Sequence, residues 1–278
     1  MSDRLKVLPQ YLMPKLALTR LAGHYAAKPM GSLTTSTIRR FVARYGVDMA
    51  EAAEPDIGAY ATFNDFFTRA LKPGARPLAQ APLICPVDGA ISQVGRIQGD
   101  QVYQAKGQTF TTTALVGGDA ELAARFQDGL FANLYLSPRD YHRIHMPAAG
   151  RLVRMVHVPG ELFSVNPTTA RGVPGLFARN ERVVCVFDDD TLGRWVLVLV
   201  GATIVGSMAT VWHGQIKRGG AVKAWDYAPG QVTLAQGDEM GRFLLGSTVV
   251  MLFEKSGLQF NPAWQPGGSI RMGESMAR

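Results

Sequence analysis

Short apolar runs rich in β-branched residues recur along the chain from Lys72 onward, and Gly or Pro residues separate them. Runs of this length, bounded by turn residues, predict β-strands. The segment of residues 239–248, which leads into the last run, is expected to begin with a charged turn. Residues 119–126 are a candidate for a short helix. The pattern predicts a β-rich body with few long helices. The predicted strands lie in residues 89–97, 129–136, 150–158, 182–187, 193–208, 230–236 and 247–254.

The first 70 residues carry a different pattern, which is typical of short amphipathic helices. In residues 4–26 apolar residues recur among basic ones, and Pro9 and Pro14 are expected to split this segment into short helices. Residues 34–46 predict a further helix with a polar N-cap that ends at Gly46, and residues 62–71 predict a short amphipathic helix. The apolar residues of the first segment include Leu8, Leu12, Leu16, Leu18, Leu21 and Tyr25.

These patterns together predict an α+β fold with two parts. Residues 1–70 would form a basic helical region, and residues 71–278 a β-rich body of sandwich or barrel type. With 278 residues, 47% of them hydrophobic, the chain can bury one large core or two modest ones. The sequence shows no low-complexity tract that would predict disorder.

The net charge of +7 belongs to the N-terminal region alone. Residues 1–45 contain eight basic residues and one acid, Asp3, whereas the rest of the chain is balanced. Apolar and cationic side chains on one segment are typical of helices that lie in a membrane interface. Nucleic acid is the other partner that a basic segment could bind, but the leucine and aromatic content favours lipid. A basic helical pair packed on the body would explain the pattern without any partner.

Other features limit the class of protein. No run of about 18 apolar residues predicts a transmembrane helix. Lys6, Pro9 and Lys15 interrupt the N-terminal apolar residues, so no signal peptide is expected. Cys85 and Cys185 both lie in apolar stretches, which predicts buried reduced thiols and a cytosolic setting. Two cysteines are too few for a Cys-rich zinc site.

Three polar clusters are candidates for chemistry: Asp88 before a glycine, the pair His142 and His145, and Ser247 after Gly246. Taken singly, each has an ordinary structural explanation, such as an Asp-Gly turn or a Gly-Ser-Thr turn. The two histidines would share one side of a helix but not of a strand. They have no further cluster of metal ligands beside them, so no metal site is predicted.

Taken together, the Asp, a His and the Ser could form a unit in which a carboxylate orients an imidazole and the imidazole accepts the hydroxyl proton. The sequence around Ser247 lacks the Gly-x-Ser-x-Gly pattern of hydrolases. The serine instead follows Gly246 directly, which suggests that its hydroxyl attacks the Gly246 carbonyl. A glycine leaves that carbonyl open and tolerates unusual backbone angles.

Seven stretches identify a family resemblance that covers nearly the whole chain. The sequence resembles the bacterial phosphatidylserine decarboxylases, the pyruvoyl-dependent, membrane-associated type. The tail beyond Phe253 is less diagnostic. The stretches are FNDFFTRALKPGARP, DGAISQVG, YLSPRDYHRIHMP, VPGELFSVNP, LFARNERVV, VGATIVGSM and EMGRFLLGST.

The resemblance implies that the chain is a zymogen that cuts itself between Gly246 and Ser247. In the implied triad, His145 takes the proton of Ser247 and Asp88 holds His145 in the required tautomer. The products would be a β chain of residues 1–246 and an α chain of residues 247–278, whose strand stays in the body. Ser247 would become a covalent pyruvoyl group, which forms a Schiff base with phosphatidylserine and yields phosphatidylethanolamine. His142 would handle the substrate or its protonation, since an imidazole can change its charge near neutral pH.

The resemblance also implies partners and a place in the cell. The enzyme would be a peripheral protein at the cytoplasmic face of the bacterial inner membrane, acting on phosphatidylserine in anionic membranes, with no nucleic acid. Its cleaved chains would form a heterodimer, and a higher homo-oligomer stays open. Two alternatives remain at this point: a pyruvoyl decarboxylase of a soluble amino acid, and a non-enzymatic β-rich lipid-binding domain in which Ser247 is a turn residue.

Overall fold

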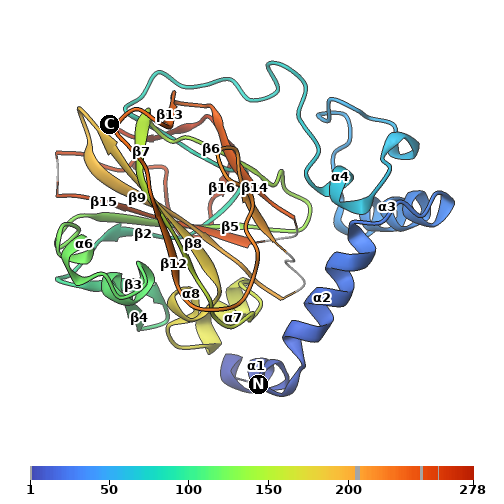
Figure 1. Ribbon diagram of the computed structural model, residues 1–278, viewed down its shortest axis with the longest axis horizontal. Helices are drawn as coiled ribbons and strands as arrows, with labels where there is room; N and C mark the ends of the chain where they lie inside the picture. Colours follow the sequence, from blue (N-terminus) through green and yellow to red (C-terminus); the bar gives the residue numbers. More distant parts are fainter. Residues whose placement is uncertain (1, 204–206, 245–246, 256) are drawn as a thin grey trace.

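The computed structural model describes residues 2–203, 207–244, 247–255 and 257–278. The body is built on an antiparallel nine-stranded sheet in the order β12-β7-β8-β9-β15-β5-β2-β16, with β13 paired to β7 (Figure 1). The predicted α+β class is confirmed. The strands are β2 (Gly89–Arg96), β5 (Leu130–Leu136), β7 (Gly150–Val158), β8 (Arg182–Asp189), β9 (Gly193–Val200), β12 (Lys223–Asp226), β13 (Thr233–Leu234), β15 (Ser247–Phe253) and β16 (Ser269–Ile270).

The central strand β15 explains why the strands are so uniformly apolar. Successive side chains of a strand point to opposite faces of the sheet. Val249, Met251 and Phe253 belong to one core, while Val250 and Leu252 belong to a second core on the other face. Because both faces are covered, every position of β15 is buried and no polar alternation appears.

Different layers cover the two faces of the main sheet. The first core lies under a four-stranded sheet in the order β11-β10-β14-β6, and the second lies under a hairpin and short helices. A small pair, β1 (Leu83–Ile84) and β17 (Ser275–Ala277), ties the C-terminal segment to the body. The covering elements are β6 (Arg143–His145), β10 (Met208–Thr210), β11 (Gly214–Gln215), β14 (Glu239–Phe243), the hairpin β3 (Gln101–Ala105) and β4 (Gln108–Thr111), and the helices α5 (Thr112–Leu115), α6 (Ala120–Ala124), α7 (Pro167–Gly172) and α8 (Leu176–Arg179).

Three predictions for the body were wrong in detail. The predicted strand at 230–236 is a strand only at Thr233–Leu234. The predicted run 193–208 ends as a strand at Val200, and the next strand begins at Met208; residues 204–206 lie outside the described ones. The charged turn expected at the start of 239–248 is the strand β14, paired with β10 and β6. Its charged side chains are accommodated by pairing, since Glu239 contacts Arg143 at 2.9 Å.

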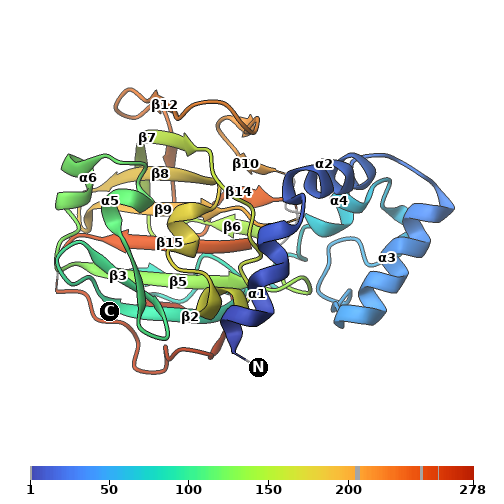
Figure 2. The same ribbon diagram turned by 90° about the horizontal axis from the view of Figure 1, so that it is seen from below.

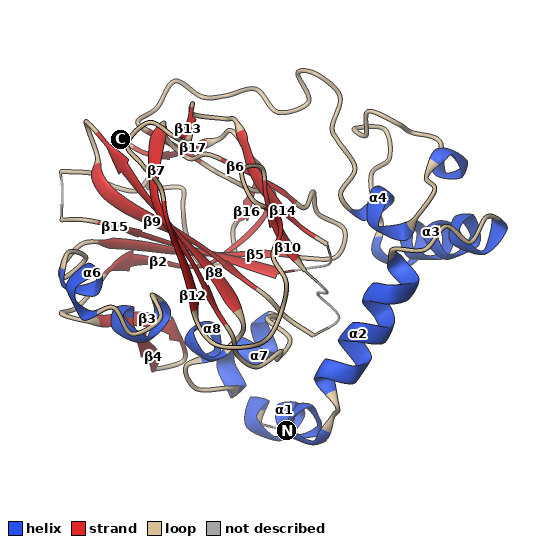
Figure 3. Ribbon diagram, in the orientation of Figure 1, coloured by secondary structure: helices blue, strands red, loops and turns tan. Residues whose placement is uncertain are grey.

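The N-terminal region forms α1 (Asp3–Leu12), α2 (Lys15–Ala26), α3 (Ser32–Tyr45), a 3-10 turn at Ile57–Ala59 and α4 (Phe63–Phe67). Figures 1 and 2 both place α2, α3 and α4 to one side of the body, and Figure 3 shows the strands gathered away from them. Phe66 and Phe67 of α4 form a small separate core with Ile38 of α3. None of the described helices is long and apolar enough to cross a bilayer.

The N-terminal helices differ from the prediction at two points. Pro9 lies inside α1, and the chain breaks only once, between α1 and α2 at Pro14. Helix α3 begins at Ser32, with Gly31 rather than a polar residue as N-cap. It ends as predicted, because Gly46 adopts the left-handed conformation (φ 69°) that glycine tolerates best.

Helix α1 packs directly on the body. Val7 is buried in the second core, and the Asp3 carboxylate accepts hydrogen bonds from Lys106 at 2.7 Å and Arg171 at 3.0 Å. Gln10 donates to Thr169 of α7 at 3.0 Å. One face of α1 therefore packs on the β-rich body, although the sequence predicts that the whole segment belongs to the membrane-associating region.

Candidate active site

Ser247 is the first residue of β15, in the middle of the main sheet. It pairs with Leu136 of β5, and its neighbour Thr248 pairs with Val200 of β9. The side chain is fully buried, and its Oγ has no hydrogen-bond partner in the described part of the chain. A buried hydroxyl without a partner costs about 1–3 kcal/mol, so such a group is more often kept for chemistry than for stability. Gly246 lies outside the described residues.

His145 lies on β6 in a neutral, fixed tautomer. Its Nδ1–H donates to the carbonyl of Gly237 at 2.7 Å, because a carbonyl can only accept. The Tyr141 hydroxyl lies 3.0 Å from Nε2 and donates to it. Burial lowers the pKa of His145, and burial raises the pKa of Tyr141 to about 12, so both groups are neutral at pH 7.

His142 immediately precedes β6 and is fully buried. Its Nδ1–H donates to the Asp140 carbonyl at 2.7 Å, which leaves Nε2 as an acceptor without a partner among the described residues. The ring packs on Phe67 of α4, with 4.1 Å between ring centroids. Burial lowers the pKa of His142 to about 3. Burial therefore favours the neutral imidazole in the chain without substrate, whereas the sequence led us to expect a side chain that changes its charge near neutral pH.

Asp88 directly precedes β2 and is held by an arginine. The Nε of Arg76 lies 3.0 Å from Oδ1, its Nη2 lies 2.5 Å from Oδ2, and the Met272 N–H donates to Oδ1 at 2.9 Å. The implied hydrogen bond from the His145 N–H to Asp88 is therefore absent among the described residues, and the Gly237 carbonyl orients the imidazole instead. The Asp88 charge still acts through space, since it raises the pKa of His145 against the effect of burial.

The Asp-Gly sequence is explained by a close backbone approach rather than by a hairpin turn. Gly89 has φ 156°, and a Cβ at this position would lie 2.2 Å from the carbonyl oxygen of Tyr135. Only glycine fits such a contact. The contact brings Asp88 to the end of β5, next to Leu136, whose other neighbour is Ser247.

The candidate residues thus gather at one end of the main sheet. The loop from Ser137 to His142 continues directly from β5, and neighbouring strands lie about 4.8 Å apart. Within the described ranges, no hydrogen bond joins Ser247 to His145 or Asp88, and no cluster of three His, Cys, Asp or Glu side chains could hold a metal ion. Cys85 and Cys185 are free and buried, as predicted, and burial raises the pKa of both thiols.

A polar cavity of about 300 Å³ lies beside this site. Sequence reasoning did not single out Arg69, Arg76 or Tyr141, although all three lie in the family-like stretches at 63–77 and 135–147. Their position inside those stretches was the signal that could have identified them. The described residues that line the polar cavity are Gly46, Asp48, Glu51, Arg69, Leu71, Arg76, Asp88, Gly89, Arg139, Asp140, Tyr141, Ser269, Ile270 and Arg271.

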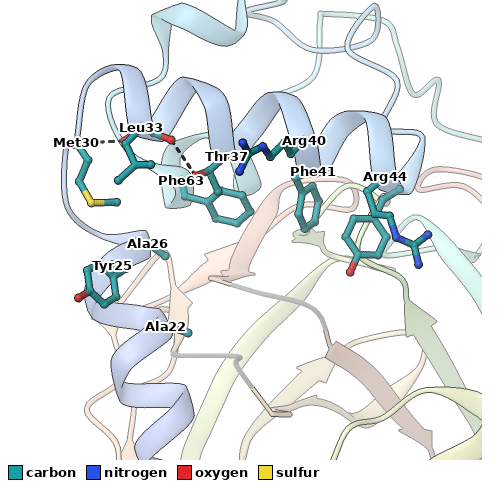
Figure 4. Close-up of a pocket in the computed structure, with 12 residues that line it drawn as sticks. Ala22, Tyr25, Ala26, Met30, Leu33, Thr37, Arg40, Phe41, Arg44 and Phe63 are labelled. Carbon is teal, nitrogen blue, oxygen red and sulfur yellow. Dashed lines mark hydrogen bonds between the residues drawn. The ribbon is translucent and has the colours of Figure 1, made fainter.

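A second, apolar cavity of about 590 Å³ lies between α2, α3 and α4 (Figure 4). Tyr25 of α2, Phe41 of α3 and Phe63 of α4 contribute aromatic rings to its lining. Arg40 and Arg44 of α3 are its only cationic lining residues in the described part of the chain. The composition suits an apolar ligand with a negatively charged end.

Comparisons with known proteins agree with the resemblance. A family model described as phosphatidylserine decarboxylase matches residues 63–278, and a second, described as PSD, matches residues 5–46. The phosphatidylserine decarboxylase proenzyme of Acidovorax ebreus (strain TPSY) is 69% identical over 279 residues, covering 100% of this chain and 98% of the relative. The proenzymes of Variovorax paradoxus (strain S110) and Methylibium petroleiphilum are 70% and 69% identical, each over 100% of this chain and 98% of the relative. The chain therefore belongs to the phosphatidylserine decarboxylase family.

Proposed function

We propose that this member of the family cuts itself at Gly246–Ser247 and then converts phosphatidylserine to phosphatidylethanolamine at the end of the main sheet. The observation that carries the proposal is the fully buried Ser247 hydroxyl, which has no hydrogen-bond partner among the described residues and lies near a loop with two neutral imidazoles. A turn serine in a lipid-binding module would gain stability from a partner or from solvent, and this one has neither among the described residues.

In the proposed cleavage, Ser247 Oγ attacks the Gly246 carbonyl carbon while His145 accepts its proton. The new C–O bond replaces the Gly246–Ser247 C–N bond, and the proton returns to the freed amine, so the amide becomes an ester. Loss of the Cα proton of Ser247 then expels Gly246 as a carboxylate. Water converts the resulting dehydroalanine to a ketone and ammonia, which leaves chains 1–246 and 247–278.

His145 is suited to the role of base because it is neutral and has one acceptor nitrogen. The Gly237 carbonyl fixes the proton on Nδ1, so Nε2 is the atom that would take the Ser247 proton. Tyr141 occupies Nε2 in the uncut chain, and its O–H must release that nitrogen first. The Asp88 charge stabilises the imidazolium that forms, without a direct hydrogen bond.

The residues at the start of β15 fit a pyruvoyl group. Ser247 is buried with a free Oγ, and Thr248 beside it also has a buried hydroxyl without a partner among the described residues. A pyruvoyl ketone supplies the electron sink that loss of carbon dioxide from an amino acid requires. His142 is proposed to hold or move a proton at Nε2 in that reaction. Its pKa would rise when an anionic substrate arrives, since a nearby negative charge favours the imidazolium.

We further propose that the N-terminal helices attach the enzyme to the cytoplasmic face of the inner membrane. Of the 15 exposed large hydrophobic residues in the described chain, 11 belong to residues 1–45, which also carry the +7 charge. The apolar side chains suit the acyl boundary and the basic ones suit anionic headgroups. The cleaved chains would stay together as a heterodimer, because β15 hydrogen-bonds to both β5 and β9.

Alanine variants of the two histidines test the division of roles. His145→Ala should leave one uncut chain, whereas His142→Ala should yield two chains that decarboxylate phosphatidylserine at least about 100-fold more slowly. Gel analysis and release of carbon dioxide from phosphatidylserine in detergent micelles report the two steps. Free serine as substrate is the matched control, and its efficient decarboxylation would favour the alternative of a soluble amino-acid decarboxylase. A fully active, fully cut His142→Ala would make that histidine structural.

A further inference from the structure

Arg69 is a buried cation without an acidic partner. It follows α4, is only 5% exposed, and forms no ion pair with any described residue. Its Nε has no hydrogen-bond partner among the described residues. Within the same residues its guanidinium group forms one long hydrogen bond, 3.3 Å from Nη2 to the Arg139 carbonyl, and lies 5.4 Å from the centroid of the Phe66 ring. Burying a charge without an ion-pair partner is costly. Burial lowers the pKa of this guanidinium, and the more distant charges of Asp88, Glu51 and Asp140 offset that effect only in part. Such a group is expected where a ligand supplies the missing charge.

The other arginines that line the polar cavity are already paired. Arg76 contacts Glu51 at 2.6 Å and Asp88 at 2.5 Å. Arg271 contacts Glu51 at 3.1 Å, and Arg139 lies 3.7 Å from Asp140. Among the described residues of this cavity, Arg69 is therefore the cation whose charge is left for an anion from outside.

The cavity is also close to the reacting groups. Asp140 and Tyr141 line it, and they directly precede His142 in the chain. Tyr141 donates to His145, and the Arg69 charge is near enough to His142 to lower its pKa further. A ligand held by Arg69 would therefore lie next to the two imidazoles.

Residues that are adjacent or close in the chain line the polar cavity and the apolar cavity of Figure 4. Tyr45 lines the apolar cavity, and the next residue, Gly46, lines the polar one. Phe63 at the start of α4 lines the apolar cavity, and Arg69 just beyond α4 lines the polar one. An apolar space followed by a space with a free cation matches a molecule with an acyl tail and an anionic head.

We propose that Arg69 binds the phosphodiester of the phospholipid substrate, with an acyl chain in the cavity between α2, α3 and α4. The inference rests on the proposed function, because it names the part of phosphatidylserine that this site would hold. The phosphodiester keeps its negative charge throughout the reaction, so an arginine there adds binding energy without opposing the chemistry. An arginine on the carboxylate would stabilise the charge that must be lost, and would raise the barrier. The fork of a guanidinium also fits two phosphate oxygens.

The test compares the cut Arg69→Gln and Arg69→Lys enzymes with wild type in detergent micelles. The extent of self-cleavage reports folding. KM and kcat are measured with phosphatidylserine as substrate. The inhibition constant is measured with dihexanoyl-phosphatidylethanolamine, which keeps the phosphodiester and lacks the carboxylate. Arg69→Gln should raise KM and the inhibition constant by the same factor, about 10- to 100-fold, with kcat within about threefold of wild type. Arg69→Lys should fall between, and Arg151→Gln, which removes an exposed pair with Asp190, should match wild type.

Three results would overturn the proposal. A rise in KM with an unchanged inhibition constant would move Arg69 to the carboxylate. Unchanged values of both KM and the inhibition constant would make Arg69 a structural cation. Equal inhibition of wild type and Arg69→Gln by inorganic phosphate would place anion binding elsewhere. If neither variant folds, inhibition of the wild-type enzyme provides the test. Dihexanoylglycerol, which lacks the phosphate, should inhibit wild type at least about 10-fold more weakly than dihexanoyl-phosphatidylethanolamine. Failure of this proposal can be distinguished from failure of the proposed function. Calorimetry measures the binding of dihexanoyl-phosphatidylethanolamine whether or not the enzyme turns over a substrate.

Discussion

Strand β15 buries all seven of its residues between two cores, whereas α1 and α2 leave Leu8, Leu12, Leu16 and Leu21 exposed, Leu12 by 90%. Both segments are rich in large apolar residues. The strand finds its partners within the chain, on β5 and β9, and contributes to the stability of the body. The helices find few partners within the chain, so their apolar faces are available to a lipid surface.

The contrast has one informative exception within the helical region. Helix α1 has a buried and an exposed side, since Val7 is inserted in the second core while Leu12 at its end is exposed. A residue on the inner face of α1 should therefore affect folding, and a residue on its outer face should affect only the membrane. The two regions can be separated experimentally by choosing residues accordingly.

The largest expected effect concerns the chemistry of the body. His145→Ala should reduce the rate of self-cleavage by at least about 100-fold, and Asp88→Asn should slow it, because the base and the charge that stabilises its imidazolium are removed. Electrophoresis of freshly purified protein measures the uncut fraction. Both variants should bind anionic liposomes as wild type does, since neither residue belongs to the helices. Rapid, complete cleavage in both would remove them from the mechanism.

The second effect concerns the outer faces of the helices. Replacing Leu8, Leu12, Leu16 and Leu21 with serine should leave a body that folds and cuts itself but that salt strips from anionic liposomes. Each fully inserted leucine contributes roughly 1.5–3 kcal/mol, and each nearby Lys or Arg on the order of 1 kcal/mol at low salt. Salt screens the second contribution and not the first. Flotation at low and high salt measures both, and binding at high salt equal to that of wild type would mean that another surface anchors the protein.

The third effect contrasts single leucines of the two regions. In the uncut Ser247→Ala chain, which unfolds as one molecule, Leu197→Ala in β9 should lower the free energy of unfolding by about 2–5 kcal/mol because Leu197 is fully buried. Leu12→Ala should change it by less than about 0.5 kcal/mol. Urea unfolding in the absence of lipid makes the comparison. A large loss in Leu12→Ala would show that α1 meets the body through its outer face as well.

The smallest effect concerns pH. Burial lowers the pKa of His142 from 6.5 to about 3, so between these values the unfolded chain binds more protons than the folded one. The free energy of unfolding should therefore fall as the pH drops below about 6.5, and this group should have no effect above about pH 7.5. His142→Gln should remove up to about 1.4 kcal/mol per pH unit of that slope. Equal slopes in the two proteins would mean that His142 is not held neutral.

How much could be predicted from the sequence differs between the two regions. The strands at 150–158 and 247–254 were predictable because apolar runs between turn residues have few other solutions. The family-like stretches also contained the site residues. The course of α1 through Pro9, and its packing through Val7, depend on contacts with α7 that no local pattern reveals.

The hydrogen-bond partners of the polar groups within the site could not be predicted from the sequence either. The resemblance implied that Asp88 orients His145, but Arg76 holds Asp88 and the Gly237 carbonyl holds His145. Arg76 and Asp88 are 12 residues apart and His145 and Gly237 are 92 apart, and neither pairing follows from a local pattern. The environment of Arg69 could not be predicted either, because only the folded molecule shows that its buried Nε has no hydrogen-bond partner among the described residues.

The central claim is that the hydroxyl of Ser247 cuts the chain and leaves a ketone in its place. An intact mass spectrum of the purified protein under denaturing conditions tests it most directly. The account predicts two chains, residues 1–246 with an ordinary C-terminus and residues 247–278 with a pyruvoyl group in place of Ser247, and one uncut chain for Ser247→Ala. A single full-length mass in a preparation that decarboxylates phosphatidylserine would contradict it, and so would two chains in Ser247→Ala.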